Sequence, residues 1–242
     1  MSQVETVSNA DNPFADGAAF IAGDYVPIDE ARVPITDWGF LHSDVTYDVV
    51  AVWGGGFFRL QDHLDRFFRG IEKLHMHSPY DRAEMAAILA ECVGRSSIRD
   101  AYVKMILTRG SPPKGQRDPR TCENQFYAFA IPYIWITPPE KQELGIHLTI
   151  SSIPRISPDS VDPTVKNFHW GDMVQGIFEA FDRGAETPVL TDGRGNITEG
   201  PGFNLFAAIG GRLVTPDSGV LLGITRKTVI ELAESLNIKV DV

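Results

Sequence analysis

The sequence predicts an α/β (α+β) protein with two domains, and three observations support this prediction. Segments with a two-residue hydrophobic period alternate with segments of helical period along the 242 residues. Strands and helices are mixed throughout, which favours sheets covered by helices over a helix bundle. The stretch TPPEKQ joins paired prolines to charged neighbours, a composition that stops both helix and sheet. We therefore expect a small N-terminal α/β domain over residues 1–136, a linker over 137–142 and a large C-terminal α/β domain over 143–242.

The N-terminal domain begins with two predicted hairpins. The first, AAFIAGDYVPI, carries a Gly-Asp pair suited to a tight turn, and the second, TYDVVAVWGGGFFRL, turns on Gly54 to Gly56. Two helices follow over 61–76 and 82–94, the first with Asp62 as its cap, and strands over 101–110 and 125–136 come next. The helices show apolar residues at helical spacing: Leu64, Phe67, Phe68, Ile71 and Leu74 in the first, and Met85, Ile88, Leu89, Cys92 and Val93 in the second.

The C-terminal domain is predicted to continue the mixed pattern. One helix carries a stripe of apolar residues that we expect to form a single buried face: Trp170, Met173, Val174, Ile177, Phe178 and Phe181. The expected order is a strand (146–153), a loop containing Lys166, a helix (170–183), a strand (187–192), a turn (193–196), a strand, a hairpin (203–216), a helix (225–237) and a strand (238–242).

Composition and charge exclude several classes of function. The formal net charge of −10 argues against a sequence-independent grip on nucleic acid, which needs clustered Lys and Arg. Two cysteines, Cys92 and Cys122, cannot form a disulfide framework, and the six histidines show no metal-binding spacing. The N-terminal 17 residues do not resemble a signal peptide, and the longest apolar stretch is too short to span a bilayer. We expect a soluble cytoplasmic protein without metal.

Lys166 is the first candidate for chemistry, because it stands just before a well-anchored helix. The positive field of a helix N-terminus and partial desolvation would both favour a neutral, nucleophilic amine. An exposed loop lysine fits the local sequence as well. Lys104 is the rival: strand alternation places it with Tyr102 and Ile106 on one face, pointing either into a cleft or into solvent.

Other candidates could hold an anion or a proton. Gly223 and Thr225 at a predicted helix start offer free amides and a hydroxyl, although such a pattern also serves as a simple cap. Arg66 suits bidentate phosphate recognition and shares a helix face with His63, or it pairs with a neighbouring aspartate. Glu199, in NITEGPGFNLF, is either partly buried with a cationic partner or solvated on a hairpin. Neither a P-loop nor a dinucleotide-binding glycine motif is present.

The order of these motifs is more specific than any one of them. DWGFLHSDVTYDV, HLDR, TRG after a strand, DPTVKNFHWGD, ITEGPGFN and GITRKTV occur in sequence from about Ala18 to the end of the chain. This series resembles the fold type IV enzymes that use pyridoxal 5′-phosphate (PLP). The group contains branched-chain aminotransferases, D-amino acid aminotransferases, aminodeoxychorismate lyases and (R)-selective amine transaminases. The resemblance implies a two-domain, D-amino acid aminotransferase-like fold and a homodimer.

The resemblance also assigns roles around the cofactor. Lys166 matches the catalytic lysine that holds PLP as an internal aldimine, and Glu199 matches the carboxylate that pairs with the pyridine nitrogen. Arg66 matches the phosphate-binding arginine. Ile224 and Thr225 match the phosphate cup at a helix start.

Within the group, HSDVTYDV and VKNFHWGD resemble the (R)-selective amine transaminases. This implies that His42, Tyr47 and Val49 bind substrate and that Arg117 admits the carboxylate of the acceptor, with Arg120 and Lys114 as alternatives. The expected reaction is a ping-pong transamination of an (R)-amine with a keto acid such as pyruvate. A D-amino acid or branched-chain amino acid aminotransferase is the alternative enzyme, and a non-catalytic PLP-binding protein is the alternative outside enzymes.

Two departures from the pattern affect these expectations. Some (R)-selective amine transaminases carry an acidic residue where this chain has Lys104, which would change the charge of the pocket. The family's later Thr-Thr-Ala-Gly-Gly segment, another phosphate contact, has no counterpart before Val242. We therefore expect the C-terminal domain to be incomplete and the natural chain to continue.

Overall fold

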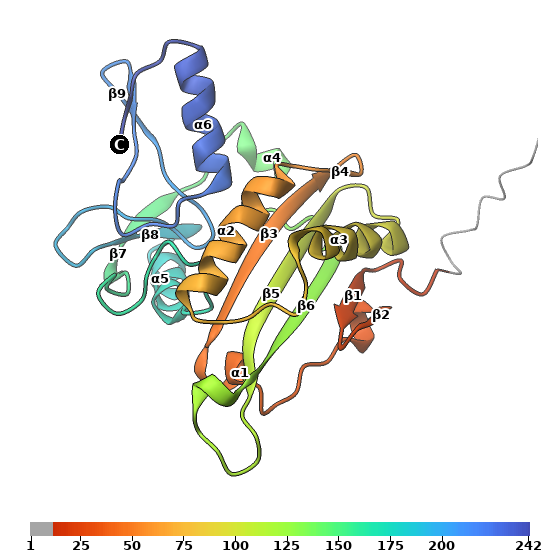
Figure 1. Cartoon of the computed structure of the whole chain (residues 1–242). Helices are drawn as coiled ribbons and strands as arrows, with labels where there is room; N and C mark the ends of the chain where they lie inside the picture. The colour runs from red at the N-terminus through yellow and green to blue at the C-terminus, as the bar shows by residue number, and fades with distance from the viewer. Residues whose placement is uncertain (1–11) are drawn as a thin grey trace, which may run out of the picture. The chain divides into compact units, whose positions relative to one another are not determined.

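A computed structural model describes residues 12–242 and separates the chain into two compact units, Met1–Ile134 and Trp135–Val242 (Figure 1). The N-terminal segment that does not resemble a signal peptide lies largely outside the described residues. Residues 137–142, expected to stop both helix and sheet, contain the short helix α4 (Pro139–Gln142). That expectation was wrong because Pro139 stands at the first helical position, where the missing N–H breaks no hydrogen bond.

Unit 1 is built on an antiparallel sheet with strand order β2-β1-β6-β5-β3-β4 (Figure 1). Three short helical segments, η2 (Ile28–Glu30), α1 (Trp38–His42) and η3 (Pro119–Thr121), connect its strands. The strands are β1 (Ala18–Ile21), β2 (Asp24–Pro27), β3 (Val45–Trp53), β4 (Gly56–Phe57), β5 (Ala101–Ser111) and β6 (Glu123–Pro132).

Both predicted hairpins form, but their turns differ in detail from the prediction. In the first, Ile21 pairs with Asp24, so the two turn residues are Ala22 and Gly23, with φ of 52° and 88°. The expected Gly-Asp turn was therefore wrong by one residue. In the second, Gly54 and Gly55 make the turn with φ of 58° and 89°, and Gly56 already belongs to β4. Two successive positive φ angles match the right-handed twist of the strands in a two-residue hairpin.

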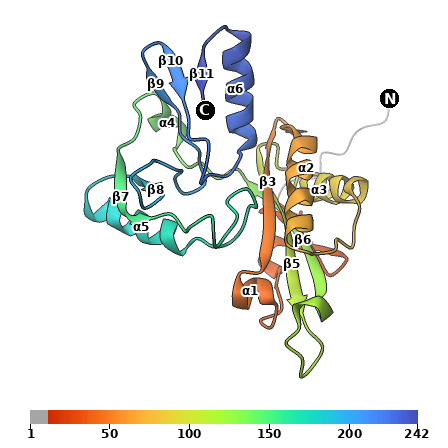
Figure 2. The same ribbon diagram turned by 60° about the vertical axis from the view of Figure 1, so that its left-hand side comes forward.

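Helices α2 (Leu60–Lys73) and α3 (Arg82–Ser96) cover one face of this sheet (Figures 1 and 2). Asp62 is not the cap of α2: Arg59 occupies that position in the left-handed region, and Asp62 accepts a hydrogen bond from its Nε at 2.5 Å. The apolar stripes predicted for both helices enter one core with the inward residues of the strands. Its buried members include Leu64, Phe67, Ile71, Met85, Ile88, Leu89, Cys92, Val50, Val52, Val103 and Met105.

The opposite face of the sheet carries the alternate residues of β3 and β5. Tyr47 is buried, Val49 and Lys104 are half-buried, and Val49 pairs with Lys104 across the two strands. The Lys104 Nζ lies 4.2 Å from the centroid of the Tyr47 ring. The predicted alternation is confirmed, and a cation–π contact partly removes Lys104 from solvent.

Unit 2 contains two small sheets, each with a helix between its parallel strands. In the first, α5 connects the parallel pair β7 and β8; in the second, α6 connects β10 to the parallel strand β11, and β9 pairs antiparallel with β10. The elements are β7 (Leu148–Pro154), α5 (Gly171–Asp182), β8 (Thr187–Thr191), β9 (Ala207–Ile209), β10 (Arg212–Val214), α6 (Ile224–Ser235) and β11 (Val240–Asp241).

Helix α5 forms as predicted, but its expected buried stripe was partly wrong. Met173 is buried, whereas Val174, Phe178 and Phe181 are 43%, 65% and 57% exposed within the described residues. The helix packs on β7 and β8 through the small residues of its sequence. A Cβ on Gly176 would lie only 3.3 Å from the Pro188 side chain, so this close approach fixes which face turns inward.

Over residues 12–242, no helix combines the length and the apolar character that a membrane crossing requires. The two cysteines are both free thiols. Burial raises the pKa of the Cys92 thiol to about 12, which makes this cysteine an inert core residue.

Candidate active site

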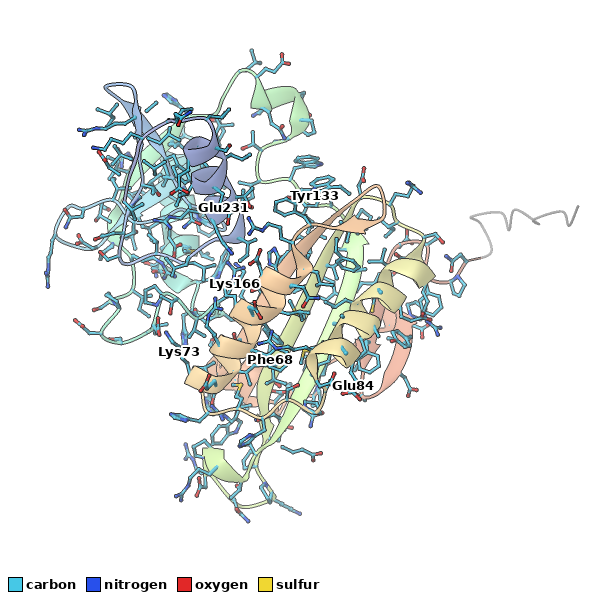
Figure 3. All side chains as sticks on the ribbon, turned by 45° about the horizontal axis from the view of Figure 1, so that its top comes forward. Phe68, Lys73, Glu84, Tyr133, Lys166 and Glu231 are labelled. Carbon is cyan, nitrogen blue, oxygen red and sulfur yellow. The ribbon has the colours of Figure 1, made fainter. Side chains whose placement is uncertain are left out.

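Lys166 lies in the loop between β7 and α5, and short hydrogen bonds determine the shape of this loop (Figure 3). The Asp162 carboxylate accepts from the Thr164 N–H at 2.8 Å and from its hydroxyl at 2.6 Å. On the other side, the Asn167 side chain donates to the Val165 carbonyl at 2.8 Å and accepts from the His169 N–H at 3.0 Å. Val165 and Asn167 are buried, so the half-buried Lys166 stands on a locally constrained backbone.

Glu199 is a buried carboxylate, 5% exposed, with three groups acting on it from within unit 2. Its Oε2 accepts from the Leu221 N–H at 2.9 Å, and its Oε1 accepts from the Arg155 Nε at 3.3 Å. Burial raises the pKa of Glu199, and the Leu221 hydrogen bond and the charges of Arg155 and Lys166 offset this rise only in part. The solvated-hairpin interpretation of Glu199 is therefore excluded.

The residues after Glu199 form a bend that requires glycine at Gly200 and Gly202. Gly200 and Phe203 exchange backbone hydrogen bonds at 3.1 and 3.2 Å, and the Phe203 ring folds over the glycine. A Cβ on Gly200 would lie 2.1 Å from that ring, and Gly202 has a φ of 85°. A side chain at Gly200 would therefore clash with Phe203, and one at Gly202 would strain the backbone, so both glycines are needed for the bend that follows Glu199.

The start of α6 has the form expected of an anion cup. Gly223 is the N-cap and supplies no capping side chain, so the amides of the first turn, beginning with Ile224 and Thr225, have no carbonyl partner within the helix. Gly223 packs against Asn204, whose oxygen would lie 2.2 Å from an added Cβ. The Asn204 amide in turn donates to the Leu221 carbonyl at 2.9 Å. Leu221 thus connects the helix start with Glu199 through its N–H.

Unit 2 by itself therefore brings together several of the predicted residues. Glu199, Leu221 and the start of α6 are connected by hydrogen bonds, and the charge of Lys166 lies close enough to lower the pKa of Glu199. The buried Arg226 side chain connects α6 to the segment after β10, because it donates a hydrogen bond to the Pro216 carbonyl at 2.9 Å. An amine, a carboxylate and free helix amides are the three kinds of group that a phosphorylated, nitrogen-containing ring would need.

Unit 1 holds the predicted phosphate ligand in a buried ion cluster. Arg66 donates from Nε and Nη2 to the two carboxylate oxygens of Asp48, at 2.8 and 2.7 Å. The His63 Nδ1 lies 2.9 Å from the same carboxylate, and Asp48 is fully buried. Burial would raise the pKa of Asp48, but the charge of Arg66 and the hydrogen bonds from His63 and Arg66 lower it to about 2. Arg66 is thus oriented by Asp48.

The predicted substrate residues occupy separate parts of unit 1. Tyr47 and Val49 share the sheet face opposite α2 and α3. His42 is exposed at the end of α1, edge-on to Trp38 at 4.9 Å between ring centroids. Arg117 is exposed in the loop after β5, and nearby Arg120 pairs with Asp118. Their substrate roles stay predictions, as do the cofactor roles of Lys166 and the other predicted ligands.

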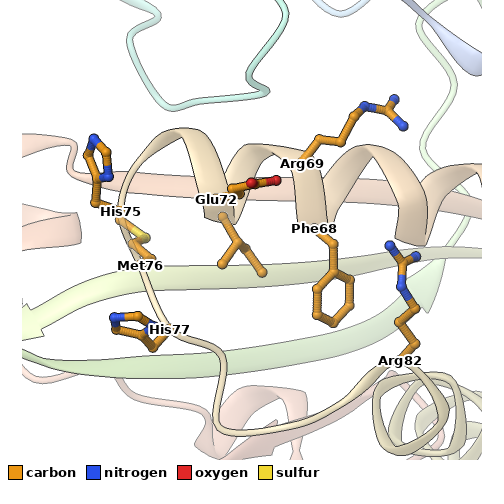
Figure 4. A pocket seen from close by; sticks show the side chains of 8 residues that line it. Phe68, Arg69, Glu72, His75, Met76, His77 and Arg82 are labelled. Carbon is orange, nitrogen blue, oxygen red and sulfur yellow. The ribbon is translucent and has the colours of Figure 1, made fainter.

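A surface pocket of ≈560 Å³ lies beside α2 (Figure 4). The Arg82 guanidinium lies over the Phe68 ring at 4.6 Å, and Figure 4 shows the two side chains facing each other. Glu72, His75, Met76 and His77 contribute to the wall. None of the predicted site residues lines this pocket, so it is not the candidate site.

Several contacts of the candidate site were not predicted from sequence. Arg155 and Asp172 form an ion pair at 2.6 Å beside Glu199, with side chains 8% and 12% exposed, and Asp48 is the partner of Arg66. Asp48 had a usable signal: it shares its strand face with Val50 and Val52, and a carboxylate on an apolar face needs a cation. Within residues 12–242, no group of three or more His, Cys, Asp or Glu side chains is arranged to hold a metal ion.

Comparisons with known proteins place these observations in a family. Residues 46–242 match the family described as amino-transferase class IV. The chain belongs to the class IV aminotransferases. The match includes Asp48, Arg66, Lys166, Glu199 and the start of α6.

Relatives of this class IV aminotransferase agree on the reaction class. The "Putative branched-chain-amino-acid aminotransferase" of Methanocaldococcus jannaschii is 32% identical over 224 residues, covering 91% of this chain and 76% of the relative. The chloroplastic D-amino-acid transaminase of Arabidopsis thaliana is 30% identical over 208 residues, covering 84% and 54%. The finer resemblance to (R)-selective amine transaminases receives no support from these relatives.

Solved structures confirm the expected fold type IV architecture. The branched-chain aminotransferase of Thermoproteus uzoniensis with norvaline has a TM-score of 0.83 at 25% identity, covering 93% of this chain and 76% of that one. The enzyme of Thermobaculum terrenum in its PLP form has a TM-score of 0.80 at 24% identity, covering 93% and 75%.

Proposed function

We propose that this class IV aminotransferase uses PLP to transfer an amino group from an amino acid to a keto acid. The observation that carries the proposal is in unit 2: the buried Glu199 carboxylate feels the charge of Lys166 and is connected to the start of α6 through the N–H of Leu221. Few ligands other than a phosphorylated pyridine would use a carboxylate, an amine and a helix N-terminus together.

Each residue has a defined task in this proposal. Lys166 binds the cofactor covalently and, once released, carries the proton between the substrate carbon and the cofactor. Glu199 holds a proton on the ring nitrogen, while Arg66 and the amides and hydroxyl at Ile224 and Thr225 bind the phosphate. When bound, PLP acts as an electron sink for the charge that develops on the substrate carbon.

For the donor, the relatives favour a branched-chain L-amino acid. The Arabidopsis relative supports a D-amino acid as the second candidate. The segment HSDVTYDV keeps an (R)-amine as a third candidate. Its residues Tyr47 and Val49 lie on one sheet face beside Lys104. Initial rates with L-leucine, D-alanine and (R)-1-phenylethylamine, each with pyruvate and with 2-oxoglutarate, test the three. Turnover of D-alanine or the amine alone would reject the branched-chain assignment.

Replacing Lys166 with Ala is expected to abolish both half-reactions. Without the amine there is neither covalent attachment of PLP nor a base at the substrate carbon. Borohydride reduction of the wild-type protein followed by peptide mass spectrometry should find the cofactor on the Lys166 peptide. Lys104→Ala is the matched control and should keep that label. A label on the Lys104 peptide would overturn the assignment.

A half-reaction test also addresses the non-catalytic alternative. A protein that only binds PLP would show the absorption of the bound cofactor but no spectral change on adding any donor. We further propose a homodimer, on the family resemblance, and a cytoplasmic location, on the two free cysteines. Light scattering of the purified protein and fractionation of the cells that produce it check these two proposals.

A further inference from the structure

We propose that Arg155 is a positioning residue that sets the ionisation of Glu199, with Asp172 as the counter-ion that divides the charge of Arg155 between two carboxylates. The inference rests on the proposed function, because it assumes that Glu199 faces the ring nitrogen of PLP. It assigns the protonation of that nitrogen to a buried ion triad, Asp172–Arg155–Glu199.

The geometry of the triad is closed and specific. The Arg155 Nη1 donates to the Asp172 Oδ2 at 2.6 Å, and its Nε donates to the Glu199 Oε1 at 3.3 Å. The three side chains are 8%, 12% and 7% exposed. The backbone N–H of Arg155 donates to the Thr191 carbonyl at 2.7 Å, so the residue has little freedom to move away.

The charges of the triad do not balance. One guanidinium faces two carboxylates, and the shorter contact is with Asp172, so Arg155 is only partly available to Glu199. Burying an uncompensated negative charge is costly, and a buried carboxylate in this position demands another cation or a proton. A protonated ring nitrogen supplies that cation. Lys166 also acts on Glu199. An imine nitrogen is a weaker base than an amine, so a covalent link to the cofactor would make Lys166 a weaker source of positive charge for this role.

Arg155 and Asp172 should therefore act on the nitrogen in opposite directions. Removing the Arg155 charge leaves Glu199 with one cation fewer, so the carboxylate depends more on the proton of the ring nitrogen, and that proton is held to higher pH. Removing the Asp172 charge leaves Arg155 wholly to Glu199, so the carboxylate is already compensated and the nitrogen releases its proton at lower pH. If Arg155 and Asp172 had merely structural roles, replacing either residue would shift the titration of the ring nitrogen in the same direction.

The test is the ¹⁵N chemical shift of PLP labelled at the ring nitrogen, recorded on the holoenzyme across a pH series. In Arg155→Met the nitrogen should keep its proton to a higher pH than in the wild type, and in Asp172→Asn it should lose the proton at a pH where the wild type keeps it. Each unit of pKa lost removes roughly tenfold of the protonated fraction at high pH. Arg155→Lys should restore the wild-type shift.

The control is Arg183→Met, since Arg183 is half-exposed and donates to Glu179 in the same unit. It should leave the nitrogen signal unchanged. If Arg155→Met does not fold, Arg155→Lys and Asp172→Asn carry the test. Unaltered titration in every variant that binds PLP would overturn the inference alone, whereas wild-type protein that binds no PLP would overturn the proposed function.

Discussion

In each unit an arginine with a largely buried side chain forms an ion pair at the candidate site, and Arg66 and Arg155 are paired in opposite ways. In unit 1, Arg66 and His63 both face the single carboxylate of Asp48. In unit 2, Asp172 and Glu199 both face the single guanidinium of Arg155. The first cluster has two donor side chains around one carboxylate, and the second has two carboxylates around one guanidinium.

The pKa values of the two acids show the consequence. The charge of Arg66 and the hydrogen bonds from His63 and Arg66 outweigh burial and hold the pKa of Asp48 at about 2. Burial dominates at Glu199, whose pKa is raised despite Leu221 and Arg155. A cluster rich in donors suits an anion such as phosphate, and a cluster short of cations suits a protonated ring nitrogen. The same kind of ion pair, an arginine with a carboxylate, thus suits an anion in one unit and a cation in the other. The difference lies in whether donors or carboxylates are the more numerous.

The largest expected effect is on unit 1, from Arg66→Met. Asp48 is fully buried, and removing its main cation leaves an unpaired charge in the core. Such a change costs about 3–5 kcal/mol of the free energy of unfolding. Urea unfolding, monitored by hydrogen exchange in the α2 peptides, measures this loss of unfolding free energy.

The control for this prediction is Arg82→Met, which breaks the exposed pair with Asp65, 47% and 54% exposed. Exposed pairs of this kind contribute about 0–1 kcal/mol. Equal losses in the two variants would mean that the Asp48 cluster does not stabilise unit 1.

The sequence was sufficient for the elements that repeat a clear period. Helix α3 has its apolar stripe where the spacing places it, because a helix that packs on a sheet turns its hydrophobic face toward that sheet. For α5 the same reasoning was wrong for Phe178 and Phe181. There the small residues Gly176 and Ala180, and not the bulky ones, permit contact with β7 and β8. Periodicity alone does not show which face of a helix packs closest to its neighbouring strands.

The candidate site divides in the same way. The types of residue and their order along the chain were enough to predict Lys166, Glu199 and Arg66 as site residues. The pairings were not predictable. The strand pattern marks Asp48 as a carboxylate that needs a cation, but Asp48 lies 18 residues from Arg66, and Arg155 lies 44 residues from Glu199. Only the folded backbone brings such residues together. The helix cap shows the same limit, since Arg59 adopts a left-handed conformation that its side-chain type does not predict.

A smaller effect concerns pH, and the two clusters should respond to acid with opposite signs. Asp48 has a folded pKa lowered to about 2, so it contributes stability above the unfolded value of about 3.9 and loses it as pH falls through the folded value. Full loss amounts to about 2 kcal/mol. Glu199 has a raised pKa, so its contribution is complete below the unfolded value of about 4.3 and is lost as pH rises through the folded value.

Unfolding free energies of the cofactor-free protein between about pH 2 and pH 7 check these signs when wild type is compared with Asp48→Asn and Glu199→Gln. Asp48→Asn should flatten the loss in acid, and Glu199→Gln should remove the loss toward neutral pH. Curves altered in the same direction by both substitutions would contradict the contrast between the clusters.

The smallest expected effect comes from Lys104, a cation of unit 1 that lies against a ring. Its Nζ lies 4.2 Å from the centroid of Tyr47, and a half-exposed cation–π contact contributes about 0.5–1 kcal/mol. Lys104→Met keeps most of the aliphatic contact and removes the charge, so urea unfolding should show a loss within that range. A loss as large as that of Arg66→Met would show that Lys104 balances a buried carboxylate, and the excess of donors in unit 1 would then extend beyond Asp48.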